Sequence, residues 1–136
     1  MAKVLFVNPV VREEDDPKHI PYGIALLATI ADKLGHKVQI YDANAWRAGD
    51  DTLKAVVQAD DWDIIGTGGI TTTYSYVKKV MEYAIKYSPQ SFRVLGGGIL
   101  TSMPQDMMQL ILGIDLGVVG EAFETFPEIL KKVDQK

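Results

Sequence analysis

Short apolar runs alternate with longer stretches of mixed polarity along the whole chain. Five of the runs are rich in Val, Ile and Leu, and most are nearly continuously apolar instead of alternating with polar residues. This pattern is typical of strands that are covered on both faces, as in a parallel sheet. The predicted strands are 3–8 (KVLFVN), 37–42 (KVQIYD), 63–67 (DIIGT), 92–95 (FRVL) and 115–119 (DLGVV).

The stretches between these runs place apolar residues three and four positions apart, which is the spacing of an amphipathic helix. The first stretch ends at Gly35, a typical C-terminal cap, and Pro104 stands in the first turn of another. Five strands alternating with five helices predict an α/β fold, a three-layer sandwich around a five-stranded parallel sheet with right-handed crossovers. The predicted helices are 23–34, 51–59, 74–87, 104–112 and 122–133.

Composition and charge narrow the function. The 136 residues suit a single domain, 1–136, and the formal net charge of −4 argues against nucleic-acid binding, which needs a basic face. No apolar run approaches the about 18–20 residues of a membrane span, and the first residues do not resemble a signal peptide, so we expect a cytoplasmic protein. The chain has no cysteine, which excludes disulfides, cysteine nucleophiles and a thiolate-held iron–sulfur cluster within it.

Glycine and small hydroxyl residues gather directly after the third, fourth and fifth predicted strands. Ligands of open parallel sheets bind beyond the carboxyl ends of the strands, near the topological switch point. Glycines let a ligand approach the backbone, and hydroxyl and N–H groups can bond its polar parts. One such turn needs no ligand, but three on the same edge favour a binding site. The candidate cofactor-binding residues are Gly66, Thr67, Gly68, Gly69, Thr71, Thr72, Gly96, Gly97, Gly98, Gly120 and Glu121.

Several familiar ligand sites do not fit this edge. A dinucleotide site needs G-x-G-x-x-G after the first strand, where 8–11 reads NPVV, and no Walker motif is present. A phosphoacceptor receiver domain needs acidic residues where Asn8 and Thr67 stand. The loop after the first strand is acidic at 13–16, which suits a solvated loop and makes it a poor host for a flavin phosphate.

The chain has two histidines, and neither belongs to a readable metal or nucleophile set. His36 precedes the second strand, at the edge opposite the expected site, and is interpreted as a surface turn residue. His19 lies in the loop at the correct edge and is a candidate for a cobalt or other metal ligand. An exposed loop residue is the favoured interpretation of His19.

Four segments, in order, resemble a known family, the cobalamin-binding domains that precede a radical S-adenosylmethionine core. The resemblance covers nearly the whole chain. It is carried by 20–27 (IPYGIALL) with 34–38 (LGHKV), by 63–66 (DIIG) with 71–74 (TTTY), by 94–98 (VLGGG) and by 120–130 (GEAFETFPEIL).

The resemblance implies a flavodoxin-like, or Rossmann-like, sheet with strand order 2-1-3-4-5. It also implies that the corrin of cobalamin lies over the strand ends and that the dimethylbenzimidazole tail passes beside the third and fourth strands. Gly97 and Gly98 would then give the tail room, and Thr72 would hydrogen-bond it. Gly66 and Gly69 would let the nucleotide loop approach closely, and Glu121 would accept hydrogen bonds from its ribose.

The chain departs from the family's Asp-x-His-x-x-Gly signature, because Ile20 stands at the histidine position and Gly68 replaces a serine after the third strand. We therefore expect a cobalamin-binding module without a protein histidine ligand to cobalt. It would present the corrin to a C-terminal radical S-adenosylmethionine domain or a partner chain, as part of a longer enzyme such as a methyltransferase. Alone it is expected not to be catalytic. The alternatives are a degenerate interaction or regulatory domain that binds no cobalamin, and a nucleotide or S-adenosylmethionine binder.

Overall fold

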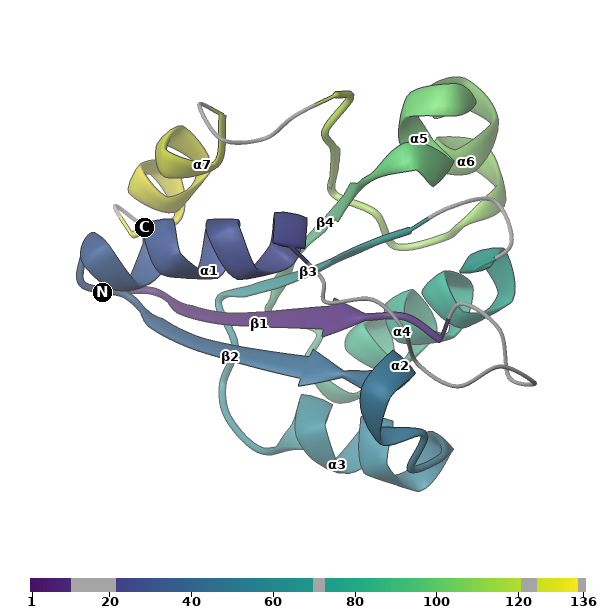
Figure 1. Cartoon of the computed structure of the whole chain (residues 1–136), viewed down its shortest axis with the longest axis horizontal. Helices are drawn as coiled ribbons and strands as arrows, with labels where there is room; N and C mark the ends of the chain where they lie inside the picture. Colours follow the sequence, from purple (N-terminus) through teal and green to yellow (C-terminus); the bar gives the residue numbers. More distant parts are fainter. Residues whose placement is uncertain (11–21, 70–72, 121–124, 135–136) are drawn as a thin grey trace.

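The computed structural model describes residues 1–10, 22–69, 73–120 and 125–134. Its centre is one five-stranded sheet in the order β2-β1-β3-β4-β5, with all neighbouring strands parallel (Figure 1). The α/β fold, the parallel sheet and the strand order 2-1-3-4-5 are confirmed. The strands are β1 (Lys3–Asn8), β2 (Lys37–Asp42), β3 (Ile64–Gly68), β4 (Phe92–Gly96) and β5 (Leu116–Gly117).

Helices cover both faces of the sheet. Helices α1 and α7 lie on one side, and α3 and α4 lie on the other, with α5 and α6 beyond β4 (Figure 1). The five predicted helices are present, and two short helices, α2 and α5, were not predicted. The helices are α1 (Tyr22–Lys33), α2 (Ala43–Trp46), α3 (Asp50–Gln58), α4 (Tyr74–Tyr87), α5 (Gly98–Ser102), α6 (Pro104–Leu110) and α7 (Thr125–Asp134).

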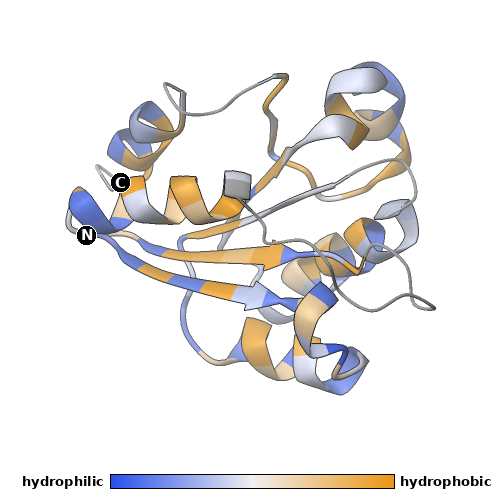
Figure 2. Ribbon diagram, in the orientation of Figure 1, coloured by the Kyte–Doolittle hydropathy of each residue, from blue (hydrophilic) through white to orange (hydrophobic). Residues whose placement is uncertain are grey.

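The two faces of the central strands each supply a hydrophobic core. Val4 and Phe6 of β1 pack with Ile64 of β3 beneath α1 and α7. Leu5 and Val7 of β1 point to the opposite face, where they pack beneath α3 and α4. Because both faces are buried, β1 is apolar along most of its length, as Figure 2 shows. This is the physical basis of the continuous apolar runs in the sequence.

Strand β5 is shorter than predicted. The sequence suggested 115–119, but only Leu116–Gly117 pairs with β4. A Cβ atom on Gly117 would lie 2.8 Å from Leu100 Cδ2 and 3.0 Å from Met108 Sδ. Side chains of α5 and α6 therefore pack directly onto the backbone of β5, which explains why a glycine stands in this strand.

The amino-terminal edge of the sheet is closed by polar contacts. The ammonium groups of Lys3 and Lys37 lie 2.8 Å and 2.7 Å from the carboxylate oxygens of Asp60. Hydrogen bonds from these lysines hold the pKa of Asp60 well below its usual range. The His36 Nδ1 atom accepts a hydrogen bond from the Ala2 N–H at 2.9 Å, so His36 lies at this edge, opposite the carboxyl ends of the strands, as expected.

Candidate ligand-binding site

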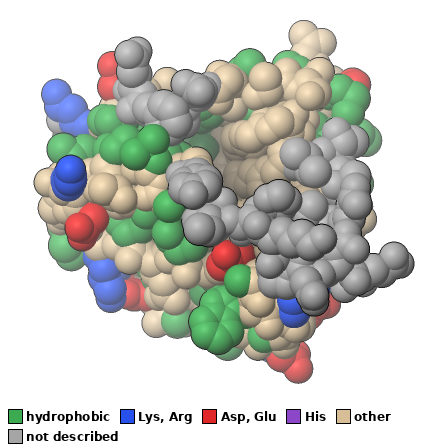
Figure 3. Space-filling model, in the orientation of Figure 1, with side chains coloured by type: hydrophobic (Ala, Val, Ile, Leu, Met, Phe, Trp, Pro, Cys, Tyr) green, Lys and Arg blue, Asp and Glu red, His purple; other side chains and the backbone are tan. Residues whose placement is uncertain are grey.

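A pocket of about 420 Å³ lies over the carboxyl-terminal halves of β3 and β4, on the side of the sheet covered by α1 and α7. Figure 3 shows it as a hollow with tan walls, the colour of backbone and small polar side chains. The volume is within the roughly 300–1,000 Å³ of small-molecule sites. The described residues that line it are Phe6, Asn8, Gly23, Ile24, Leu27, Ile64, Gly66, Thr67, Gly68, Val94, Gly96, Gly97, Val118, Gly120 and Phe126.

The register of β3 and β4 creates the hollow. Gly68 lies directly beside Gly96, and one layer deeper Gly66 lies beside Val94. Side chains alternate between the faces of a strand, so Gly66, Gly68 and Gly96 share the face beneath α1 and α7. Three glycines on one face leave the sheet without side chains there. A Cβ atom on Gly96 would meet nothing nearer than the Val118 carbonyl oxygen at 3.8 Å, so this glycine opens space that a ligand can use.

Gly68 and Gly97, unlike Gly96, are required by the packing of the chain itself. Gly97 has φ 84° and ψ −178°, a conformation that is essentially restricted to glycine. A Cβ atom on Gly97 would lie 2.8 Å from the Gly69 nitrogen, and one on Gly68 would collide with the Gly96 carbonyl oxygen. The Ile99 N–H also donates to the Gly69 carbonyl at 2.7 Å. These glycines therefore let the loops after β3 and β4 pack together.

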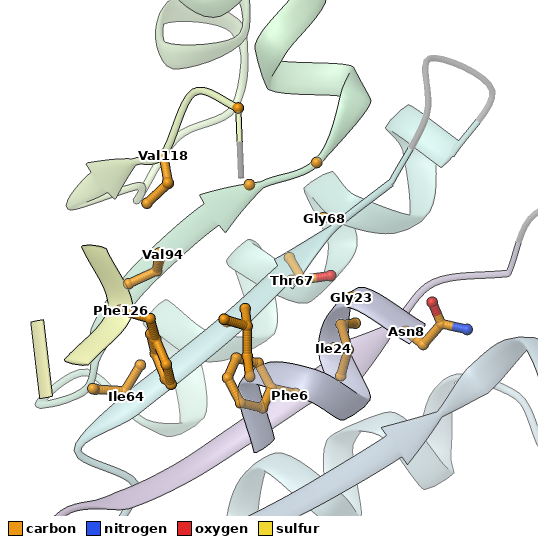
Figure 4. Close-up of a pocket in the computed structure, with 15 residues that line it drawn as sticks. Phe6, Asn8, Gly23, Ile24, Ile64, Thr67, Gly68, Val94, Val118 and Phe126 are labelled. Atoms are coloured by element: carbon orange, nitrogen blue, oxygen red, sulfur yellow. The ribbon is translucent and has the colours of Figure 1, made fainter. Parts of the chain in front are cut away.

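Aromatic and branched apolar side chains line the deeper part of the pocket. The rings of Phe6 and Phe126 have centroids 5.3 Å apart and planes inclined by 51°. Phe6 leans over Gly66, since a Cβ atom there would be 3.1 Å from two of its ring carbons. Figure 4 shows Phe6, Phe126 and Ile64 gathered below the open end. Such walls suit a flat apolar group.

The polar side chains of the pocket are held by the protein. The Asn8 amide nitrogen donates to Asp42 Oδ1 at 2.9 Å, and the same carboxylate oxygen accepts from the Ala45 N–H at the start of α2. The buried Thr67 hydroxyl donates to the Val7 carbonyl at 2.8 Å. No charged side chain is among the described lining residues. The pocket therefore suits an uncharged group, and a charged part of any ligand would stay at the mouth.

Six of the predicted site residues meet at this pocket: Gly66, Thr67, Gly68, Gly96, Gly97 and Gly120. Gly69 and Gly98 lie next to it without lining it. Thr71, Thr72, Glu121 and the weak metal candidate His19 lie outside the described residues. Within the described part of the chain, no group of three or more His, Asp or Glu side chains could hold a metal ion.

The sequence interpretation missed the apolar half of the site. Phe6 and Phe126 were not among the candidate site residues, because strand and helix patterns do not distinguish a packed face from a pocket wall. Gly23 belongs to the family-like segment 20–27 (IPYGIALL), which pointed to the start of α1 as part of the site. It lines the open end of the pocket (Figure 4).

A second hollow of about 350 Å³ lies at the end of β2 and shares no lining residue with the first. It is bordered by Tyr41, Tyr76 and the ion pair between Lys79 Nζ and Asp50 Oδ1, which are 2.9 Å apart. Burial raises the pKa of the Tyr76 hydroxyl. The sequence interpretation did not anticipate this hollow.

A family model described as B12 binding domain matches residues 9–130, and the chain belongs to this family. The suspected family is thus confirmed. No curated protein sequence matches the chain. None of the helices in the described residues combines the length and the hydropathy that a membrane span requires.

Solved structures share the fold. The radical S-adenosylmethionine methyltransferase TsrM from Kitasatospora setae, with tryptophan substrate and a SAM analogue bound, has a TM-score of 0.85 and 20% identity over 99% of this chain. TsrM with cobalamin and a [4Fe-4S] cluster bound has a TM-score of 0.83 and 19% identity over 98% of this chain. The cobalamin-dependent S-adenosylmethionine radical enzyme OxsB, with aqua-cobalamin bound, has a TM-score of 0.79 and 16% identity over 99% of this chain. The chain spans 26%, 25% and 19% of these three chains, respectively.

Proposed function

We propose that the chain binds cobalamin, with the nucleotide tail in the glycine-lined pocket and the corrin over the carboxyl ends of the strands. The pocket between Gly66, Gly96 and α1 is the observation that carries this proposal. It lies at the edge where open parallel sheets bind ligands. Membership of the B12 binding domain family, and the cobalamin bound in TsrM and OxsB, support the same ligand.

The residues present fit the tail better than they fit the corrin. A benzimidazole is flat and largely apolar, which matches the walls formed by Phe6, Val94 and Phe126. Gly96 leaves the room that a side chain would fill. The ribose and phosphate would remain near the mouth. Thr72 would hydrogen-bond the tail, and Glu121 would accept hydrogen bonds from the ribose.

Cobalamin, when bound, supplies the organometallic chemistry, while this chain holds and orients it. We propose that no histidine of the chain ligates the cobalt. His36 lies at the opposite edge of the sheet, and its Nδ1 atom accepts from the Ala2 N–H. His19→Ala should therefore leave the visible spectrum of the complex unchanged. A spectral shift in that variant would assign His19 as a ligand.

The partner of the bound corrin would be a radical S-adenosylmethionine domain, on the same polypeptide or on another chain. TsrM and OxsB, which contain this fold within much longer chains, motivate the proposal. Without cysteine, the chain cannot supply thiolates for an iron–sulfur cluster. Its role is therefore binding and presentation, not catalysis by itself, and we expect it in the cytoplasm.

The test is retention of hydroxocobalamin by the purified chain. At micromolar protein, the chromophore should co-elute on gel filtration with a shifted visible spectrum. Gly96→Leu places a side chain in the open part of the pocket and should abolish co-elution. Tyr41→Phe, at the second hollow, is the control and should bind like the parent chain. Free elution of cobalamin from the parent chain would contradict the proposal.

One observation favours a second candidate, an interaction or regulatory domain that binds no cobalamin. The Phe6 ring leans over Gly66 and narrows the deeper part of the pocket. Ile20 and Gly68 also occupy positions where the family signature has histidine and serine. Co-purification with another chain, without any change in the spectrum of added cobalamin, would favour this candidate.

A further inference from the structure

The pocket changes character with depth. Its upper layer lies at the ends of β1, β3 and β4. Gly68 and Gly96 are paired neighbours in this layer, and Asn8 is the last residue of β1. The next layer is formed by Phe6, Gly66 and Val94, which occupy one row across the same three strands. Below this row lies Ile64, which is fully buried. The described side chains of the deeper rows are thus entirely apolar.

The two polar side chains nearest these rows each donate a hydrogen bond within the protein. The Thr67 hydroxyl donates to the Val7 carbonyl, and the Asn8 amide nitrogen donates to Asp42. Gly66 and Val94 belong to the paired ladders of the sheet. In the deep rows of Phe6, Gly66, Val94 and Ile64, the described side chains carry neither a hydrogen-bond donor nor an acceptor.

We infer that this pocket selects the base of the bound cobamide, accepting a benzimidazole and discriminating against a purine. The inference rests on the proposed function and deepens it. A purine carries additional ring nitrogens and, in adenine, an amino group. These atoms lose their hydrogen bonds to water when they enter an apolar pocket, and no described side chain of the deep rows replaces them. A benzimidazole has fewer polar atoms to desolvate, and its methyl-bearing edge suits the walls of Phe6 and Phe126.

The test compares three ligands on the full chain: cobalamin, the cobamide with adenine in place of dimethylbenzimidazole, and cobinamide, which lacks the nucleotide tail. Dissociation constants are measured by isothermal titration and by the visible spectrum. We expect cobalamin to bind at least about tenfold more tightly than the adenine form, a difference of about 1.4 kcal/mol. Cobinamide should bind most weakly.

The outcomes separate the inference from the proposed function. If cobalamin and the adenine cobamide bind within about threefold of each other, the inference is wrong while the proposed function stands. If cobinamide binds as tightly as cobalamin, the tail does not enter the pocket and the inference is again wrong. If none of the three ligands binds, the proposed function itself fails.

A matched pair of variants tests the pocket wall directly. Val94→Thr adds a hydroxyl to the wall with nearly the same shape, so it should reduce the preference for cobalamin severalfold. Val94→Ala removes apolar contact without adding a polar group and should weaken both cobamides while keeping the preference. Thermal unfolding confirms that each variant is folded before it is titrated. An unchanged preference in folded Val94→Thr would contradict the role of this wall.

Discussion

Neighbouring glycines in the turn after β4 should respond in opposite ways to the same substitution. Gly96 ends β4 and is not among the glycines with positive φ, and a Cβ atom there would make only an ordinary van der Waals contact, 3.8 Å from the Val118 carbonyl oxygen. Gly97 has φ 84°, and a Cβ atom there would lie 2.8 Å from the Gly69 nitrogen. Replacing each by alanine separates the space that a ligand can use from the space that the chain uses itself.

The expected magnitudes follow from these geometries. Gly96→Ala should raise the free energy of unfolding by about 0.4–1 kcal/mol, because alanine restricts the unfolded chain and fits the native backbone. Gly97→Ala should lower it by on the order of 1–3 kcal/mol from backbone strain alone. The close approach to the Gly69 backbone adds to this loss. The two variants should therefore differ by about 1.4–4 kcal/mol.

The assay is urea unfolding followed by far-ultraviolet circular dichroism and by tryptophan fluorescence. Trp62 is buried beside α3 and the sheet and becomes exposed on unfolding, whereas Trp46 is already exposed. The parent chain and both variants should give similar slopes, so that the midpoints report stability. Equal midpoints for Gly96→Ala and Gly97→Ala would contradict the claim that only Gly97 is held to glycine by its backbone conformation and close packing. So would a Gly96→Ala variant that unfolds at lower urea than the parent chain.

Two further predictions concern α7 and the opposite edge of the sheet. Leu130 is fully buried but does not line the pocket, so Leu130→Ala should cost about 2–5 kcal/mol of stability and leave the cobalamin affinity of the folded chain unchanged. Phe126 lines the pocket, so Phe126→Leu should weaken cobalamin binding with a smaller loss of stability. Urea unfolding and cobalamin titration of both variants check these expectations. Contacts with Lys3 and Lys37 lower the pKa of Asp60 in the folded chain. The stability that these contacts give is fully present above the unfolded-state pKa of about 3.9 and is lost as the pH falls through the lower folded-state pKa. Urea midpoints against pH should show this acid loss in the parent chain and not in Asp60→Asn.

Much of the fold could be predicted from pattern alone. The bounds of β1, β2 and α4 agree with the predicted ranges, because each is either a compact apolar run or a long amphipathic helix. Helix α2 was missed because its four residues are too few for any periodicity. It depends on the Asp42 side chain, which accepts from the Ala45 N–H.

The site was predictable only in part, for a related reason. Glycines after strands mark an edge of the sheet, and six candidate residues do meet there. Pattern could not distinguish Gly96, which leaves open space, from Gly97, whose conformation serves a loop contact. It also could not place Phe126 against Phe6, since that contact depends on how α7 packs across the sheet, far away in sequence.

The most direct test of the central claim is a nuclear magnetic resonance titration of the nitrogen-15-labelled chain with cobalamin. The amide signals of Gly66, Gly68, Gly96 and Phe126 should change most. Signals around the second hollow, such as those of Gly49 and Tyr41, should change little. Changes confined to that second hollow, or no changes at all, would contradict binding of cobalamin in the glycine-lined pocket.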